Sequence, residues 1–328
     1  MDKLIAGFSN QLMKALDIAH NYQFKLAKNT HIDNVLIIGL GGSGIGGTIV
    51  QNYVFDKINV PVIVSKAYTL PRFTHKNTLV ITCSYSGNTE ETIYSLKDAI
   101  RLGCPIVTIT SGGKIGDLSE EHGLDCIRIP AGFPPRSCLG YSMTQILNTL
   151  AHFELISNAF ETEIQAAISL LDNEEEAIKA EALRIAQTIA HKMPVIYIEN
   201  NMEGVAIRWR QQFNENGKML AWHHVIPEMN HNELVGWRDI DTNKAVFFLR
   251  TQMDHERSKL RMELNKETIA QYTPHILEIY SKGNSYLENA FYLIYLGDWI
   301  SWYLAIERNF DATEVKVIDA LKSSLNEK

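Results

Sequence analysis

Short apolar runs alternate with helix-length segments along most of the chain. The first series lies at residues 35–38, 60–64, 79–83, 106–109 and 126–129. Runs of four to six apolar and β-branched residues without polar alternation are typical of strands that are covered on both faces. Their alternation with helices predicts an α/β fold with a parallel sheet sandwiched between helices.

The same order of elements returns in the second half of the chain, although the residues themselves barely repeat. Apolar runs lie at residues 195–198, 223–226, 245–249 and 276–280, again with helical segments between them. A leading helix is expected over about residues 8–28 and a closing helix over about residues 314–325. The pattern predicts a second parallel sheet of the same kind.

A long helical pattern separates the two series. It covers residues 145–190 and contains the acidic patch at residues 174–176. A chain of 328 residues is also long for one hydrophobic core. We expect an N-terminal domain over residues 1–150, a helical linker over 151–190 and a C-terminal domain over 191–328.

Composition narrows the possible ligands and the location. The net charge is −7 and no basic run compensates for it, so the chain is not expected to bind nucleic acid, and any anionic ligand should be small and held locally. The four cysteines form no CxxC pair and the N-terminus lacks a signal-peptide pattern, which favours reduced thiols and a cytoplasmic protein. The apolar segment 291–306 is short and contains Asp298, so we expect a core or interface helix rather than a membrane span.

The most informative segment is the predicted strand 78–83 with the polar turn that follows it. Ser84, Ser86 and Thr89 offer hydroxyls, Gly87 allows a tight turn, and a helix is expected from Glu90. Helix N-termini bind anions through free N–H groups and the helix dipole. The segment therefore predicts a phosphate-binding cup, with a simple helix cap as the alternative.

A glycine-rich loop follows the first predicted strand. It contains the spacing Gly39-x-Gly41-x-x-Gly44 of dinucleotide-binding folds. However, Ser65 and Lys66 stand where an acidic ribose ligand would be needed, and no Walker lysine follows, so a dehydrogenase or nucleotide site is disfavoured. We expect the loop to approach a small polar ligand through Gly41, Gly42 and Ser43, and together with the cup it indicates a sugar-phosphate pocket at one sheet edge. A tight turn without a ligand is the alternative.

Two further segments carry groups suited to proton-transfer chemistry. Pro134 and Pro135 stiffen the chain before Arg136, whose permanent cation suits an oxyanion. Glu215 lies near the end of a predicted helix between two amides, and its carboxylate suits a general base. A surface arginine and a solvent-facing glutamate are the structural alternatives.

Histidines and glutamates gather after this helix, at positions 223, 224, 228, 231 and 233. Their spacing matches neither HExxH nor another standard zinc pattern, so no metal site is expected. His231 is better suited to acid/base or hydrogen-bonding work, with a structural histidine as the alternative.

These motifs, in this order, resemble the bifunctional phosphoglucose/phosphomannose isomerases, a branch of the phosphoglucose isomerase superfamily with two sugar isomerase (SIS) domains. The resemblance rests on GLGGSGIGG at 39–47, SYSGNTEET at 84–92, PPRSCLGYS at 134–142, FNENGK at 213–218 and NHNELVGW at 230–237. It implies two SIS domains, each a flavodoxin-like, doubly wound parallel sheet between helices.

The resemblance also implies an activity in carbohydrate metabolism, in glycolysis or gluconeogenesis. Glucose 6-phosphate and mannose 6-phosphate would be interconverted with fructose 6-phosphate through a cis-enediol, without a metal or cofactor. The phosphate would lie on Ser84, Ser86 and Thr89, and the sugar against Gly41, Gly42 and Ser43.

The catalytic roles implied by the resemblance are divided among several segments. Glu215 would shuttle the proton between C1 and C2, and Arg136 would stabilise the enediolate. His231 from the other subunit of a homodimer would assist ring opening, together with a lysine of the closing helix, Lys322 or alternatively Lys316. The chain departs from the family pattern at Ala312 and Glu314, where prolines are expected, and at Gly217, where alanine is expected.

Other functions are less consistent with the chain. A non-catalytic sugar-phosphate sensor would need the cup but not Arg136, Glu215 and His231 together. An aminating isomerase normally carries a glutaminase domain with an N-terminal cysteine, which this chain lacks. An isomerase of another phosphosugar stays open.

Overall fold

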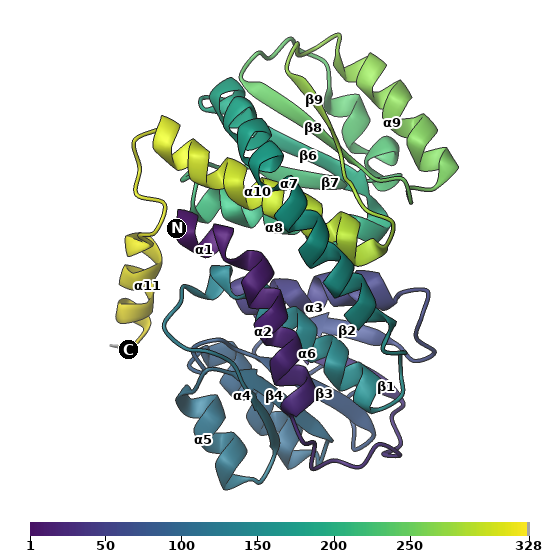
Figure 1. Cartoon of the computed structure of the whole chain (residues 1–328), viewed down its shortest axis with the longest axis vertical. Helices are drawn as coiled ribbons and strands as arrows, with labels where there is room; N and C mark the ends of the chain where they lie inside the picture. Colours follow the sequence, from purple (N-terminus) through teal and green to yellow (C-terminus); the bar gives the residue numbers. More distant parts are fainter. Residues whose placement is uncertain (327–328) are drawn as a thin grey trace.

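The computed structural model describes residues 1–326 and contains two parallel sheets, which lie at opposite ends of the molecule (Figure 1). The first sheet has the strand order β2-β1-β3-β4-β5 and the second the order β7-β6-β8-β9. The strands are β1 (Asn34–Ile38), β2 (Val62–Ser65), β3 (Thr78–Cys83), β4 (Ile106–Thr110), β5 (Asp125–Arg128), β6 (Met193–Glu199), β7 (Trp222–Ile226), β8 (Lys244–Arg250) and β9 (Ile276–Tyr280). The predicted α/β fold is confirmed.

Helices cover both faces of each sheet. The helices of the described residues are α1 (Asp2–Ala6), α2 (Phe8–Asn21), α3 (Gly41–Val54), α4 (Glu90–Arg101), α5 (Gly113–Glu121), α6 (Leu139–His152), α7 (Ala159–Ile189), α8 (Glu203–Glu215), α9 (Glu256–Ile269), α10 (Tyr286–Glu307) and α11 (Lys316–Asn326), of which α11 lies away from both sheets (Figure 1). Strand residues alternate between the two layers. In β1, Leu36 packs in one apolar cluster with Leu96 of α4, whereas Ile37 belongs to the larger cluster on the opposite face.

The strand order places a topological switch point in the first sheet. β1 lies between β2 and β3, with Ile38 paired to Ser65 on one side and Thr82 on the other. The connections after β1 and β3 therefore leave the carboxyl edge side by side, which is where ligands of such sheets bind. The glycine loop and the serine-rich turn follow these two strands.

The leading helix is shorter than the prediction of residues 8–28, because α2 ends at Asn21. Tertiary hydrogen bonds replace helical ones beyond that point. The buried Asp125 carboxylate accepts hydrogen bonds from the backbone N–H of Lys25 (2.8 Å) and Leu26 (2.9 Å) and from the Tyr22 hydroxyl (2.9 Å). This carboxylate holds the segment after α2 in an extended path that sequence periodicity did not reveal.

Two long helices lie side by side between the two sheets, α7 and α10 (Figure 1). α10 is buried without interruption from Tyr286 to Ser301, which agrees with the expected core helix. Within residues 1–326 the structure has no helix with the apolar length needed to cross a bilayer. The domain limits expected near residues 150 and 190 stay a prediction.

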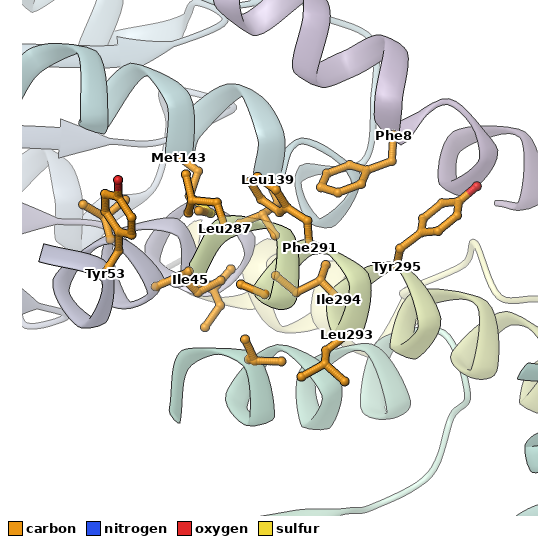
Figure 2. Close-up of a cluster of buried hydrophobic side chains, with 14 of the residues drawn as sticks. Phe8, Ile45, Tyr53, Leu139, Met143, Leu287, Phe291, Leu293, Ile294 and Tyr295 are labelled. Atoms are coloured by element: carbon orange, nitrogen blue, oxygen red, sulfur yellow. The ribbon is translucent and has the colours of Figure 1, made fainter. Parts of the chain in front are cut away.

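One apolar cluster joins the two halves of the molecule. Figure 2 shows Phe291 and Ile294 of α10 among side chains from three helices of the N-terminal half: Phe8 of α2, Ile45 and Tyr53 of α3, and Leu139 and Met143 of α6. The Phe8 and Phe291 rings meet edge to face with centroids 5.5 Å apart. The two sheets therefore share a core and are not connected by a flexible tether.

Replacing Phe291 by alanine tests this shared core. Because the ring is fully buried, Phe291→Ala should lower the free energy of unfolding by about 3–5 kcal/mol in urea titrations. Ile306→Ala, on the exposed end of the same helix, should change it by less than about 0.5 kcal/mol. Equal effects of the two substitutions would contradict the shared core.

Candidate functional site

Three loops meet at the carboxyl edge of the first sheet. The backbone N–H of Tyr85 donates a 2.9 Å hydrogen bond to Ser43 Oγ, which joins the serine-rich turn to the glycine loop. Gly42 packs against the loop of Arg136 so closely that a Cβ on Gly42 would lie 2.9 Å from the Arg136 backbone. Glycine is required there because any side chain would push the arginine loop away.

The serine-rich turn forms a cup at the N-terminus of α4. Ser84 Oγ lies 2.9 Å from Thr89 Oγ1, and Gly87 has the left-handed φ of +67° that lets the turn close. Thr89 occupies the N-cap position, but its side chain makes no capping hydrogen bond to α4. The simple capping alternative therefore does not describe what the Thr89 hydroxyl does, and the first N–H groups of α4 stay available to an anion.

A small hollow lies between these loops. Polar groups from the glycine loop, the serine-rich turn and α6 contribute to its lining, together with Pro135 of the arginine loop and buried apolar side chains. The polar contributors include Ser43, Ser84, Tyr85 and Ser142. The hydroxyls of this lining can hydrogen-bond a phosphate or a sugar hydroxyl.

Arg136 is buried, with only 3% of its surface exposed, and its guanidinium contacts the second half of the chain. Nε donates to Asn216 Oδ1 (2.7 Å), and Nη2 donates to the backbone oxygens of Ala312 (2.9 Å) and Thr313 (2.8 Å). Nη1 lies 3.5 Å from the Glu215 carboxylate. Burial lowers the pKa of Arg136 while the Glu215 charge opposes that shift, and a guanidinium remains protonated in either case.

Glu215 is the last residue of α8, and its side chain is 27% exposed. The helix end is fixed by Asn216, which is fully buried and donates through Nδ2 to Ser301 Oγ (2.9 Å) of α10. The carboxylate therefore lies beside a fixed cation and keeps access to solvent. This arrangement suits proton transfer on a bound substrate.

Within the described residues, neither His231 nor the two lysines of α11 make a hydrogen bond or an ion pair with Arg136 or Glu215. His231 ends the short 3₁₀ turn Glu228–His231, is exposed, and its imidazole makes no hydrogen bond within residues 1–326. Lys316 and Lys322 are exposed on α11, which lies at the edge of the molecule (Figure 1). Lys218 Nζ instead donates a 2.6 Å hydrogen bond to the carbonyl oxygen of Glu215. No local sequence pattern indicated this contact.

The neighbouring histidines and glutamates separate into individual pairs. His223 lies 3.3 Å from Glu203, and His224 Nδ1 lies 2.9 Å from Glu233, which also accepts a 2.6 Å hydrogen bond from Tyr197. Over the described residues, no three side chains of the metal-binding types gather at one point. The contacts of Glu233 anchor the loop that carries His231 to β6 and β7 of the second sheet.

A buried ion pair lies beneath the site. Arg208 of α8 donates to Asp298 of α10 through Nη2 (2.7 Å) and Nε (3.2 Å). Burial raises the pKa of the Asp298 carboxyl, and the Arg208 charge opposes that shift. The pair fixes the helix that ends in Glu215 against the central helix.

Comparison with known proteins gives consistent matches over the whole chain. The family model "Bacterial phospho-glucose isomerase C-terminal SIS domain" matches residues 178–325. The bifunctional phosphoglucose/phosphomannose isomerase of Caldicellulosiruptor bescii is 39% identical over 100% of this chain and 99% of its own length. The enzyme of the same name from Aquifex aeolicus is 35% identical over 98% of this chain and 97% of its own.

Solved structures share the fold at lower identity. The C-terminal domain of glucosamine-fructose-6-phosphate aminotransferase from Francisella tularensis superposes with a TM-score of 0.77 at 15% identity. The match covers 95% of this chain and 97% of that domain. At this identity the likeness establishes the arrangement of two SIS-type sheets and no more.

The buried ion pair yields a stability test. Arg208→Met leaves Asp298 buried without its cation, so it should lower the free energy of unfolding by about 3–5 kcal/mol in urea titrations at neutral pH. Adding Asp298→Asn removes the uncompensated charge and should restore part of that loss. Arg184→Met, which breaks the exposed pair with Glu181, should cost no more than about 1 kcal/mol. A double variant less stable than Arg208→Met would contradict the charge argument.

Proposed function

This chain belongs to the bifunctional phosphoglucose/phosphomannose isomerases, which are sugar-phosphate isomerases, and we propose that it interconverts glucose 6-phosphate and mannose 6-phosphate with fructose 6-phosphate. The observation that carries the proposal is the Arg136–Glu215 pair beside the anion cup. A base, a fixed cation and a phosphate site are the groups that such an isomerisation needs.

The phosphate would anchor the substrate in the cup. Ser84, Ser86 and Thr89 would donate from their hydroxyls, and the free N–H groups of α4 would add the positive end of the helix dipole. Gly41, Gly42 and Ser43 would border the sugar chain. The hollow between the loops supports this placement, because it lies between the cup and the arginine loop.

Proton transfer would run through Glu215. The carboxylate would take the proton from C2 of the open-chain aldose, so that the C–H electron pair forms the C1–C2 double bond and negative charge gathers on O1. The same group would return the proton to C1 while the proton of the O2 hydroxyl passes to O1, so that C2 becomes the carbonyl carbon of the ketose. The exposure of the Glu215 side chain beside a buried cation supports this role.

Arg136 would stabilise the charge on the oxygen of the enediolate intermediate. Three of its contacts fix the guanidinium, and Nη1 is the nitrogen that faces Glu215. A cation that is already fixed needs no reorganisation when the charge develops. Because the planar enediol has lost the C2 configuration, both epimers could form from one intermediate.

Ring opening would require groups from outside the Arg136–Glu215 pair. We propose that His231 reaches the site of a second copy in a homodimer and that Lys322, or alternatively Lys316, approaches from α11. The imidazole of His231 is exposed and has no hydrogen-bond partner among residues 1–326, which supports its use in another subunit. A cytoplasmic location and a place in glycolysis or gluconeogenesis are part of the same proposal.

The central test is a coupled assay of the EDTA-treated protein on glucose 6-phosphate and mannose 6-phosphate in parallel, with Glu215→Gln beside the wild type. The wild type should turn over both sugars. Glu215→Gln should lose about 10²–10⁴-fold in kcat on both, since the general base is removed, while fructose 6-phosphate still binds in calorimetry. Glu121→Gln, an exposed carboxylate in the same domain as the cup, is the matched control.

The outcomes separate the alternatives. Wild-type activity on neither sugar would favour a sensor or another phosphosugar. Loss of binding in Glu215→Gln with turnover retained would reject the assignment of the base.

The homodimer can be tested by mixing two inactive variants. If His231 acts in trans, His231→Ala and Glu215→Gln subunits in equal amounts should form heterodimers with one complete site each. After random exchange, activity should recover to about a quarter of the wild-type value. No recovery, with exchange verified by mass spectrometry, would place His231 in its own subunit's site, and an active His231→Ala variant before mixing would place it outside the chemistry.

A further inference from the structure

The turn after α8 has an unusual backbone for its sequence. Lys218 adopts φ = +53°, in the left-handed region that disfavours residues with a Cβ. Arg308 fixes this turn from outside, since its Nη1 donates to the carbonyl oxygens of Gly217 (2.5 Å) and Lys218 (2.8 Å). This left-handed residue lies in the turn that ends α8, and the N–H of Met219 donates back across it to the carbonyl oxygen of Phe213 (3.2 Å).

The Lys218 ammonium makes its contacts inside the site. Nζ donates to the carbonyl oxygen of Glu215 (2.6 Å) and to the carbonyl oxygen of Glu314, and it lies 3.6 Å from the Glu314 carboxylate. Its side chain is only 16% exposed. With these partners, protein carbonyl groups engage two of the three N–H donors of the ammonium.

The partner segment is the one that also fixes Arg136. The carbonyl oxygens of Ala312 and Thr313 accept from Arg136, and the next carbonyl along the chain, that of Glu314, accepts from Lys218. Three consecutive carbonyls therefore face two cations. The segment 312–314 connects the arginine to the end of the helix that carries Glu215.

We propose that Lys218 is a positioning residue, which sets the separation between Glu215 and Arg136 by holding the end of α8 against the segment 312–314. The inference rests on the proposed function, in which these two groups act on one substrate. Arg136 Nη1 and the Glu215 carboxylate are 3.5 Å apart and form no direct hydrogen bond. The hydrogen bonds that each residue's surroundings make therefore fix the distance between them. A displacement of about 1 Å between reacting groups is enough to cost on the order of 10²-fold in rate.

The test compares Lys218→Met and Lys218→Gly with the wild type. Both remove the ammonium, but glycine also relaxes the left-handed backbone. Each should lower kcat about 10- to 100-fold, while KM for fructose 6-phosphate changes less than about threefold, because the phosphate cup is in another domain. Lys76→Met, at an exposed lysine, is the matched control and should leave both constants unchanged.

An isotope effect separates positioning from simple destabilisation. With glucose 6-phosphate deuterated at C2, the primary isotope effect on kcat should rise in both variants, since proton transfer becomes more fully rate-limiting. Turnover within twofold of wild type would overturn the inference. A fall in kcat that tracks a lower melting temperature, without a change in isotope effect, would also overturn it.

Failure of the inference is distinguishable from failure of the proposed function. If the wild-type protein isomerises the two hexose phosphates and the Lys218 variants do so equally well, only the inference fails. If the wild type isomerises neither sugar, the proposed function fails first. If Lys218→Met is too unstable to assay, Lys218→Gly gives the same readouts with the backbone relaxed.

Discussion

The buried guanidinium of Arg136 connects three separate parts of the molecule. Its backbone packs against Gly42, while its side chain reaches Asn216 and, at the far end of the chain, the carbonyls of Ala312 and Thr313. A buried cation without partners would be strongly unfavourable, so these contacts must form together for the chain to fold. The site is therefore a consequence of folding and is complete only when both sheets and the C-terminal segment are assembled.

The central helix makes that assembly possible. α10 is apolar on every side over most of its length, and the only stable place for such a helix is between two layers. It contacts the helices of the first sheet through Phe291 and the helix of Glu215 through the Asp298–Arg208 pair. A rigid core between the two sheets holds groups from both halves of the chain at fixed distances, as the proposed reaction requires.

The sequence predicted those parts of the structure that depend on residues close to one another along the chain. The strands, the glycine loop and the serine-rich turn each follow from local apolar runs and turn chemistry, and the sheet order then brings the last two together. The end of α2 was missed because Asp125, about a hundred residues away, satisfies the backbone there. Lys218 was missed for the same reason, since its importance lies in a contact to the C-terminal segment that no local pattern encodes.

The second sheet shows why a shared fold does not mean a shared site. Its strand order matches that of β2-β1-β3-β4 in the first sheet, so the turn after β8 corresponds to the cup after β3. There, however, both oxygens of the buried Glu199 carboxylate accept the N–H of His255, the residue that caps α9 (3.0 Å each). The Glu199 carboxylate thus occupies the N-terminus of α9, whereas the corresponding N–H groups of α4 in the first half stay available to a bound anion. The second domain contributes to the site in a different way, through the end of α8 with Glu215 and through the side chains that hold Arg136 in place.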